Sequence, residues 1–368
     1  MLSKLINHYE FLHTIPELGF EEYKTSAYLA DHLEQAGFQV SRNVSGTTGL
    51  VGIYDSGIPG PTLALRADMD ALGHVIDGVR CARHTCGHDA HSSIVLRVAE
   101  ELMDEKALQK GVLKILFQPA EELGAGALAM INGGAIDDVD ILLGLHIRPQ
   151  EECQKGQAIP AMFYAASAII EAVFTGVPAH GARPHLGVNA IDAATAAIHA
   201  VNAIHLNPNL SYSAKATQFL CDSGVTNAIP SEARVCWDIR AQFNSTMDEL
   251  RTKVFHAIKS GAATVGATAE VQVIRELPAA ELDEEITSLL ADSIKEVLGK
   301  EGLLKPIYTP GGEDFFFYTQ KKPELKAGFL GLGVNALPGL HHPDMHFDVD
   351  ALHNGVKIVK VAVKKVLS

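Results

Sequence analysis

The sequence of 368 residues is poor in cysteine and tryptophan, with five of the first and one of the second. A sparse and odd set of cysteines is not a disulfide framework, so a reducing, cytoplasmic location is expected. No stretch reaches the roughly 18 uninterrupted apolar residues that a membrane span needs. The segment from Met1 to Glu10 contains no apolar core of a secretory signal, so no such signal is expected.

Positive charge is also scarce, because 30 Lys and Arg residues stand against 44 Asp and Glu residues and give a formal net charge of −14. Binding along a nucleic acid or to an anionic membrane needs a cationic face, so neither partner is expected. Hydrophobic residues at 47% and charged residues at 20% are typical of a globular chain and exclude extensive disorder.

In the first and last parts of the chain, short aliphatic or β-branched runs alternate with helical segments. Such alternation predicts an α/β domain with a mostly parallel sheet covered by helices on both faces. The expected strands are 49–54, 62–67, 112–117, 141–146 and 329–332, and the expected helices are 2–33, 92–104, 284–298 and one from residue 350.

The middle of the chain has a different order of expected strands and helices. It predicts a strand at 165–175, a helix at 189–204, strands at 215–222 and 233–243, a helix at 247–263 and a strand at 269–274. This β-α-β-β-α-β order is that of a ferredoxin-like α+β domain. We therefore expect one domain of residues 1–156 and 278–368, interrupted by a smaller domain of residues 157–277.

The densest group of reactive side chains lies between His84 and His91. A thiolate and an imidazole two residues apart, Cys86 and His88, can bind a borderline-soft divalent metal. Gly87 between them permits a tight backbone path. A loop with a buried thiol and solvated histidines fits the same residues.

Acidic residues and a histidine follow two of the apolar strands. Glu121 and Glu122 come directly after one strand, where Pro119 favours a departure from strand geometry, so one carboxylate could bind metal while its neighbour handles protons. A solvated helix start is the alternative. His146 closes the next strand, and sites in open α/β sheets gather at the carboxyl ends of strands. Glu122 and His146 are thus expected to face one crevice, although a lone histidine there can be structural.

Two further groups lie near the C-terminus. His341 and His342 form a pair before Pro343 that is ambiguous between metal ligand and surface. The loop 310–315 is either a glycine-hinged segment around an acid or a turn before a helix.

Taken in order, these motifs resemble the M20 metallopeptidase family, in particular its amidohydrolase branch, from one end of the chain to the other. That branch contains N-acyl-amino-acid amidohydrolases, hippurate hydrolases, N-acetyldiaminopimelate deacetylases and plant auxin-conjugate hydrolases. The matching segments are 13–22, 66–72, 86–89, 118–122, 144–146 and 312–315.

The resemblance implies two divalent metal ions per subunit in the larger domain. Five residues match the family's ligands: Cys86, His88, Glu122, His146 and His341. Glu121 matches the general base, and Asp68 matches an acidic position near the metals that does not bind them. The resemblance favours manganese and the thiolate favours zinc, while nickel and cobalt also fit these donors.

The resemblance also implies that the inserted domain is a lid. His180 matches the histidine that this domain presents to the substrate carbonyl. Asn227 and Arg240 match residues that grip a substrate carboxylate, although a turn residue and a surface charge would fit these two positions equally. Lid strands can pair edge to edge between subunits, so a homodimer through the lid is a further expectation. The sequence leaves open whether His180 serves its own subunit or a partner.

The expected activity is hydrolysis of the amide bond of N-acyl amino acids, or of similar small amides that carry a carboxylate, by metal-activated water. A dipeptidase or aminopeptidase that uses the same metals is the alternative within enzymes. A non-catalytic metal- or metabolite-binding protein is the alternative of another class, but all five ligand positions and the base are filled. Gly73, His74, Arg83 and Val349 depart from the family's pattern, so substrate identity does not transfer.

Overall fold

The computed structural model describes residues 2–368, and the chain divides into two compact units. The first unit consists of Met1–Phe163, Glu281–Tyr308 and Asp314–Ser368, and the second of Tyr164–Ala280 and Thr309–Glu313. The expected insertion, residues 157–277, did not include the short segment Thr309–Glu313. Because both units contain separated stretches of sequence, the chain passes from one to the other at four points.

A seven-stranded mixed sheet forms the centre of the first unit, in the order β1-β2-β6-β3-β7-β17-β8. The four middle strands run parallel, and the outer strands are antiparallel to their neighbours. The sheet is therefore mainly parallel, as expected from the sequence. The bounds are β1 Gln39–Ser41, β2 Leu50–Asp55, β6 Val112–Gln118, β3 Thr62–Asp68, β7 Ile141–Pro149, β17 Lys326–Ala336 and β8 Ala158–Ile159.

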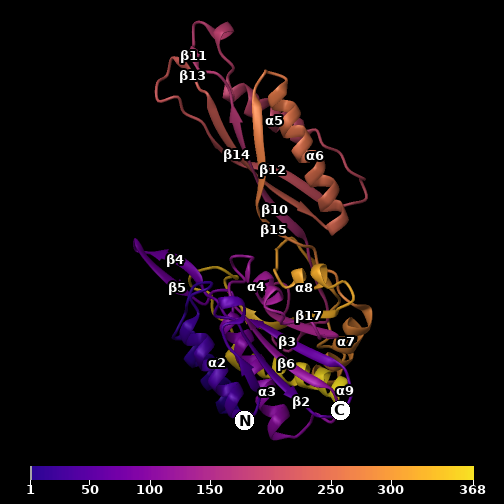
Figure 1. The fold of residues 1–368 in the computed structure, drawn as a ribbon. Helices are drawn as coiled ribbons and strands as arrows, with labels where there is room; N and C mark the ends of the chain where they lie inside the picture. Colours follow the sequence, from indigo (N-terminus) through magenta and orange to yellow (C-terminus); the bar gives the residue numbers. More distant parts are fainter. Residues whose placement is uncertain (1) are drawn as a thin grey trace. The chain divides into compact units, whose positions relative to one another are not determined.

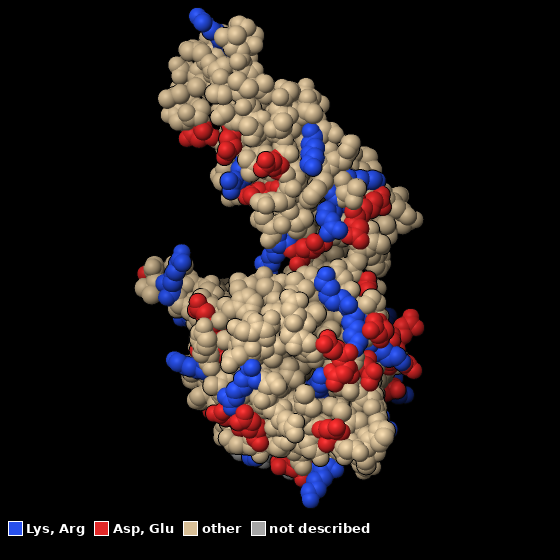
Figure 2. Space-filling model, in the orientation of Figure 1, with Lys and Arg blue, Asp and Glu red and all other residues tan. Residues whose placement is uncertain are grey.

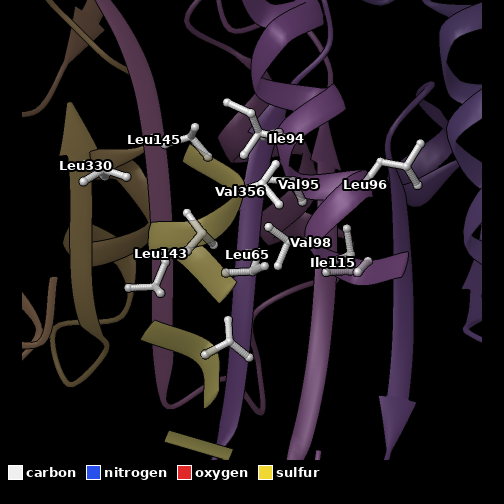
Figure 3. Packing of buried hydrophobic residues seen from close by; sticks show 14 of the residues in the cluster. Leu65, Ile94, Val95, Leu96, Val98, Ile115, Leu143, Leu145, Leu330 and Val356 are labelled. Carbon is white, nitrogen blue, oxygen red and sulfur yellow. The ribbon is translucent and has the colours of Figure 1, made fainter. Parts of the chain in front are cut away.

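Helices cover this sheet and bury the apolar side chains of its strands. Figure 3 shows Leu65 of β3 and Leu143 of β7 packed with Val95 and Val356, which come from two helices far apart in sequence. All four side chains are almost wholly buried, which is the main source of stabilisation in such a layered fold. The helices of this unit are α1 Leu2–His13, α2 Tyr23–Gln35, α3 His88–Asp104, α4 Gly126–Asn132, α7 Glu284–Leu298, α8 Phe316–Lys321 and α9 Leu352–Leu367.

The single N-terminal helix expected over residues 2–33 is wrong, because α1 and α2 are separate helices. The chain between them contains Pro16, which cannot continue a helix, and Phe20, whose φ of 66° is left-handed. Gly19 lies close to Ala120, since a Cβ at Gly19 would stand 3.0 Å from the Cα of Ala120. This connecting loop therefore packs against the segment that leads into Glu121.

A β-hairpin after β3 was also missed. Its strands are β4 Leu72–Ile76 and β5 Val79–Arg83, and Figure 1 shows the hairpin extending from the body of the first unit. Asp77 and Gly78 form its two-residue turn with φ values of 51° and 79°. An Asp-Gly pair between two strands is a strong hairpin signal, so this element was readable from the sequence.

The second unit has a four-stranded antiparallel sheet in the order β12-β14-β10-β15, with two helices packed on it. Its elements follow the β-α-β-β-α-β order that the sequence predicts. A two-stranded pair, β11 and β13, follows on from one end of β10 and β14 (Figure 1). The bounds are β10 Ala166–Thr175, β11 Ala179–His180, α5 Ala190–Asn202, β12 Tyr212–Leu220, β13 Ala228–Ile229, β14 Glu232–Ala241, α6 Asn244–Ala263 and β15 Thr268–Leu277.

The remaining elements are short. They are β9 Met162–Tyr164, β16 Ile307–Thr309 and three 3-10 turns at Val44–Gly46, Pro184–Leu186 and Val349–Ala351. Among residues 2–368, no helix has both the length and the apolar character that crossing a bilayer requires. Figure 2 shows acidic and basic side chains intermixed over the drawn face of the first unit.

Candidate active site and metal centre

Cys86 lies at the centre of a cluster of potential metal ligands in the first unit. It precedes α3 in a loop whose next residue, Gly87, has a φ of 89°. A Cβ at Gly87 would stand 2.3 Å from Cδ1 of Ile147. Only glycine therefore allows the backbone to pass this closely beside β7 and still place Cys86 and His88 on the same side of the turn.

The five residues expected to bind metal come together around this thiol. The Sγ atom of Cys86 lies 3.4 Å from Nε2 of His146 and 3.3 Å from Nε2 of His341. The Nε2 atom of His341 also lies 3.3 Å from Oε1 of Glu122. Ligand atoms of Cys86, His88 and His146 form one group within 4.8 Å, and those of Cys86, Glu122 and His341 form a second.

Of the two adjacent histidines near the C-terminus, His341 reaches the cluster. Its backbone N–H donates to the carbonyl of Thr85 at 2.7 Å, so the main chain of this loop is fixed one residue before Cys86. His342 is exposed, and its Nδ1 accepts the backbone N–H of Asp344 at 3.1 Å. The structure thus separates two residues that the sequence left as an ambiguous pair.

A buried nitrogen without a hydrogen bond shows that this cluster suits a metal ion. His88 is 0% exposed, and its Nε2 makes no hydrogen bond with any described residue. Its Nδ1 is held at 3.0 Å from Oδ1 of Asp70, a contact that orients the ring as carboxylates commonly orient metal-binding histidines. Nε2 then faces Glu121 and Glu122, with an oxygen of each at 3.9 Å. A divalent cation would satisfy this nitrogen.

The protonation of the two other buried donors also fits a cation. Burial and the negative charge of Glu122 raise the pKa of the Cys86 thiol well above its ordinary value, so the thiolate needs a nearby positive charge. Burial lowers the pKa of His146 well below its ordinary value. Nδ1 of this neutral ring donates to the carbonyl of Ile147 at 2.6 Å, which leaves the lone pair on Nε2 directed at Cys86.

Asp68 lies beside the cluster and is fully buried. One carboxylate oxygen accepts from Nδ1 of His91 at 2.7 Å, and the other accepts from the guanidinium of Arg66 at 2.5 Å. The nearer oxygen lies 3.9 Å from Nδ1 of His88. Asp68 therefore contacts Arg66 and His91 directly and lies near His88 of the cluster.

Glu121 is 8% exposed and stands next to Glu122, one of the candidate ligands. Its Oε1 accepts the backbone N–H of Asp314 at 3.4 Å. The residue before it, Ala120, is fully buried and has a left-handed φ of 51°, which is strained for a residue with a side chain. This turn is what brings two successive carboxylates to one site, as the position of Pro119 suggested.

Two supporting carboxylates were missed at the sequence level. Asp70 bridges the cluster, because its Oδ2 accepts the backbone N–H of Glu122 at 3.0 Å while its Oδ1 holds His88. Glu22 is fully buried and accepts the N–H of Ala120 at 2.8 Å. Asp70 could have been suspected from its spacing of two residues from Asp68 at a strand end. No local signal pointed to Glu22.

The residues expected to act from the inserted domain do not lie together. His180 pairs with Ala228 across β11 and β13, and the carbonyl of the neighbouring Asn227 accepts the N–H of Gly181 at 2.7 Å. Arg240 instead pairs with Ser167 near the other end of β10 and β14. The eight residue-to-residue steps from Thr175 back to Ser167 span about 26 Å of strand, so the two ends of the sheet are well separated.

The guanidinium of Arg240 is held within its own unit. Its Nε and Nη2 donate to Asp238 at 2.9 and 3.0 Å, and its Nη1 donates to the carbonyl of Pro310 at 2.5 Å. These contacts fix the side chain, and a substrate carboxylate would have to compete with Asp238 for it.

Comparison with known proteins identifies similar sequences and folds across the whole chain. Residues 64–365 match the model of peptidase family M20/M25/M40. A probable hydrolase of Synechocystis is 31% identical, with 98% of this chain and 95% of the relative aligned. The N-acetyl-L-cysteine deacetylase of Bacillus subtilis is 30% identical, with 99% and 88% aligned. A crystal structure from Bacillus subtilis, described as a dinuclear metal-binding peptidase of the M20 family, covers 100% of this chain and 98% of its own, with a TM-score of 0.81 at 25% identity.

Proposed function

Because the chain belongs to peptidase family M20/M25/M40, we propose that it hydrolyses the amide bond of N-acyl amino acids at the cluster around Cys86. Membership of the family, with relatives that are amidohydrolases, makes the chain a metal-dependent hydrolase of amide bonds. The Bacillus subtilis relative is named for N-acetyl-L-cysteine, which is an N-acyl amino acid. The observation that carries the proposal is the convergence of Cys86, His341 and the other three candidate ligands beside the buried turn that precedes Glu121.

Two divalent ions would be held by Cys86, His88, Glu122, His146 and His341. One of the two donor groups adds His88 and His146 to the thiolate, and the other adds Glu122 and His341. Thiolate and imidazole donors suit zinc, and the carboxylate makes manganese an alternative. When bound, ions of this kind lower the pKa of a water ligand toward about 7 and polarise a carbonyl group.

Glu121 is placed to move the proton in this reaction. Its Oε2 lies 3.9 Å from Nε2 of His88, at the edge of the ligand cluster, while its Oε1 is held by the N–H of Asp314. We assign to it the removal of a proton from the attacking water, whose oxygen bonds to the amide carbon. The same carboxyl then delivers that proton to the nitrogen as the C–N bond breaks, giving a carboxylate and an amine.

We assign the second unit the role of a lid that supplies polar contacts to the substrate. His180 and Asn227 would contact the carbonyl and carboxylate groups, and Arg240 would contact a carboxylate. An N-acyl amino acid is far shorter than the length of β14 that separates Arg240 from the other two residues. The three side chains of one chain therefore serve two active sites, which favours a homodimer joined through the second unit.

The test of the catalytic assignment compares neighbouring glutamates. Glu121→Gln is expected to retain bound metal and to lose roughly 100- to 10,000-fold in kcat, because a general base contributes about that much. Glu122→Gln is expected to lose metal as well as activity. Glu301→Gln, at an exposed position of the same unit, is the control and keeps both. Elemental analysis and hydrolysis of N-acetyl amino acids are measured on each variant, and unchanged hydrolysis by Glu121→Gln would overturn the assignment.

The substrate class is tested on the wild-type protein with matched pairs. Each N-acetyl amino acid is compared with a dipeptide that carries the same C-terminal residue and a free α-amine. The proposal expects a higher kcat/KM for the acetylated member of each pair. Preference for the dipeptides would instead establish a peptidase that uses the same metal cluster.

A further inference from the structure

Three helices of the first unit bring a second set of metal-binding side chains together, and none of them belongs to the cluster around Cys86. His8 comes from α1, His32 from α2 and Glu100 from the last turns of α3. One ligand atom of each lies within 4.8 Å of the others. We propose that His8, His32 and Glu100 bind one divalent metal ion of the zinc class and so join the three helices.

The separations of the donor atoms are close to those of a tetrahedral site. Bonds of about 2.0–2.1 Å to zinc place neighbouring ligand atoms about 3.3 Å apart. Nε2 of His8 lies 3.2 Å from Oε1 of Glu100, and Nδ1 of His32 lies 3.8 Å from the same oxygen. A shift of a few tenths of an ångström in the His32 side chain, which is 27% exposed, would bring its Nδ1 close to the separation from Glu100 that a shared zinc ion requires. Water can supply the fourth ligand from that open side.

Each of the three side chains is oriented by a contact with a neighbouring residue, and this contact leaves one potential ligand atom facing the other two side chains. Nδ1 of His8 is hydrogen-bonded to the hydroxyl of Tyr28 at 2.8 Å, so Nε2 is the atom that faces Glu100. The other carboxylate oxygen of Glu100 accepts from Arg97 at 2.7 Å. The His32 ring packs edge-on against the His8 ring, with centroids 4.8 Å apart. Such outer contacts are typical of metal ligands in proteins.

The protonation states also suit a cation. Burial, together with the charge of His8, lowers the pKa of His32, so its ring is neutral and keeps a lone pair at neutral pH. Although burial opposes ionisation, His8 and Arg97 lower the pKa of Glu100 to about 2, so its carboxylate is charged. Lys4 and Arg97 add positive charge nearby, whereas Asp31 adds negative charge.

The experiment measures zinc stoichiometry in the intact protein. Metal is removed by dialysis against a chelator, zinc is returned at micromolar concentration, and zinc per chain is counted by elemental analysis after gel filtration. Wild type is expected to hold about one more zinc per chain than His32→Asn or Glu100→Gln. His199→Asn, which changes an exposed histidine on α5, is the matched control and is expected to match wild type.

Two further readouts separate this site from the cluster around Cys86. His32→Asn is expected to hydrolyse N-acetyl amino acids at the wild-type rate, because its ring contacts none of the residues placed in the active site. Added zinc is expected to raise the melting temperature of wild type further than that of His32→Asn. Equal zinc content and equal melting shifts in both proteins would show that the three side chains form a hydrogen-bonded cluster only, and would overturn the proposal.

Discussion

Replacing Glu22 tests whether a carboxylate with no contact to the metal cluster fixes the position of Glu121. Glu22 is buried between Thr48, whose hydroxyl it accepts, and Ala120, whose N–H lies 2.8 Å from its Oε1. Ala120 is held at a φ of 51° directly before Glu121. The carboxylate therefore stabilises a strained turn directly before Glu121, the proposed base.

The expected losses of stability and of kcat follow from the groups that Glu22→Ala leaves without a partner. A buried N–H without an acceptor costs about 1–3 kcal/mol. Once the Glu22 carboxylate is gone, the left-handed turn at Ala120 can relax and release strain of order 1–3 kcal/mol. Because relaxation of the turn offsets part of the cost of the unpaired N–H, we expect a net loss of at most about 1–3 kcal/mol in the stability of the first unit, or roughly 2–10 °C in melting temperature. Displacement of Glu121 by an ångström would lower kcat by about 100-fold.

The assay compares Glu22→Ala with two variants. Glu22→Gln keeps an oxygen for the N–H of Ala120, and its amide can donate to Thr48, so most of the activity should remain. Glu17→Ala removes a carboxylate from the same loop, but Glu17 accepts the N–H groups of Lys24 and Thr25 at the start of α2. The Glu17→Ala variant should therefore be less stable to unfolding than wild type, with an unchanged kcat. If Glu22→Ala and Glu17→Ala have the same kcat at saturating substrate, the positioning argument fails.

Two further predictions concern the loop at Cys86 and the stability of the helical layer. Gly87→Ala should lower both the melting temperature and the metal content, since its Cβ would stand 2.3 Å from Ile147. The control is Gly46→Ala, because Gly46 has a φ of 74° and no atom within 4 Å of the added Cβ. This control measures the cost of the backbone strain alone, which is about 1–2 kcal/mol. The folded-state pKa of Glu100 is about 2 against an ordinary 4.5, so its stabilising effect is complete above pH 4.5 and disappears as the pH falls toward 2. The difference in melting temperature between metal-free wild type and Glu100→Gln should therefore be constant above pH 5 and vanish near pH 2, and a difference that persists there would contradict this account.

The middle strands and the helices that cover them were predictable because their signals are local. β6, β3 and β7 are buried on both faces and are nearly continuous apolar runs, as parallel strands between two layers of helices must be. The outer strands β1 and β8 have three and two residues, too few for a pattern. Their direction depends on pairing with distant strands, which no local pattern encodes.

The break between α1 and α2 was missed although Pro16 and Gly19 mark it in the sequence, because the apolar stripe of the segment was given more weight. An apolar stripe continues through Tyr23 and Leu33, so the segment looks like one amphipathic helix. Pro16 and Gly19 end α1 and start a loop that packs on Ala120. Helical periodicity cannot show that two helices with similar stripes are separated by a functional loop.

The five candidate ligands and Asp68 were predicted from motifs and lie close together, whereas Asp70 and Glu22 were missed. Cys86, Glu122 and His341 lie far apart in sequence, and only the resemblance to a family connected them before the structure placed their atoms within hydrogen-bonding distance. Glu22 acts through a backbone N–H, so nothing in its own sequence neighbourhood marks it. Arg240 and His180 were both predicted to contact the substrate, and most of the length of β14 separates them in the structure.

Beneath the cluster, a buried ionic network explains how ligands from separate strands keep one geometry. Arg66 donates to Asp68 and, at 2.9 Å, to Asp314, and all three side chains are fully buried. Burial raises the pKa of Asp314 to about 6 even though Arg66 opposes the shift, which shows how costly a second buried carboxylate is here. An apolar core of the same volume would be at least as stable.

What the network adds is orientation. Asp68 accepts from Nδ1 of His91, and the opposite nitrogen of that ring accepts the N–H of Ile147 at 2.9 Å. A backbone donor on Nε2 requires the proton to be on Nδ1, so the His91 tautomer is fixed by the fold. This chain of contacts joins β3 to β7 at the residue beside His146, while Asp70, two residues after the end of β3, holds His88. The ring of His88 and the backbone beside His146 are thereby held from one short segment of the chain, residues 68–70, and the buried charges are what this alignment costs.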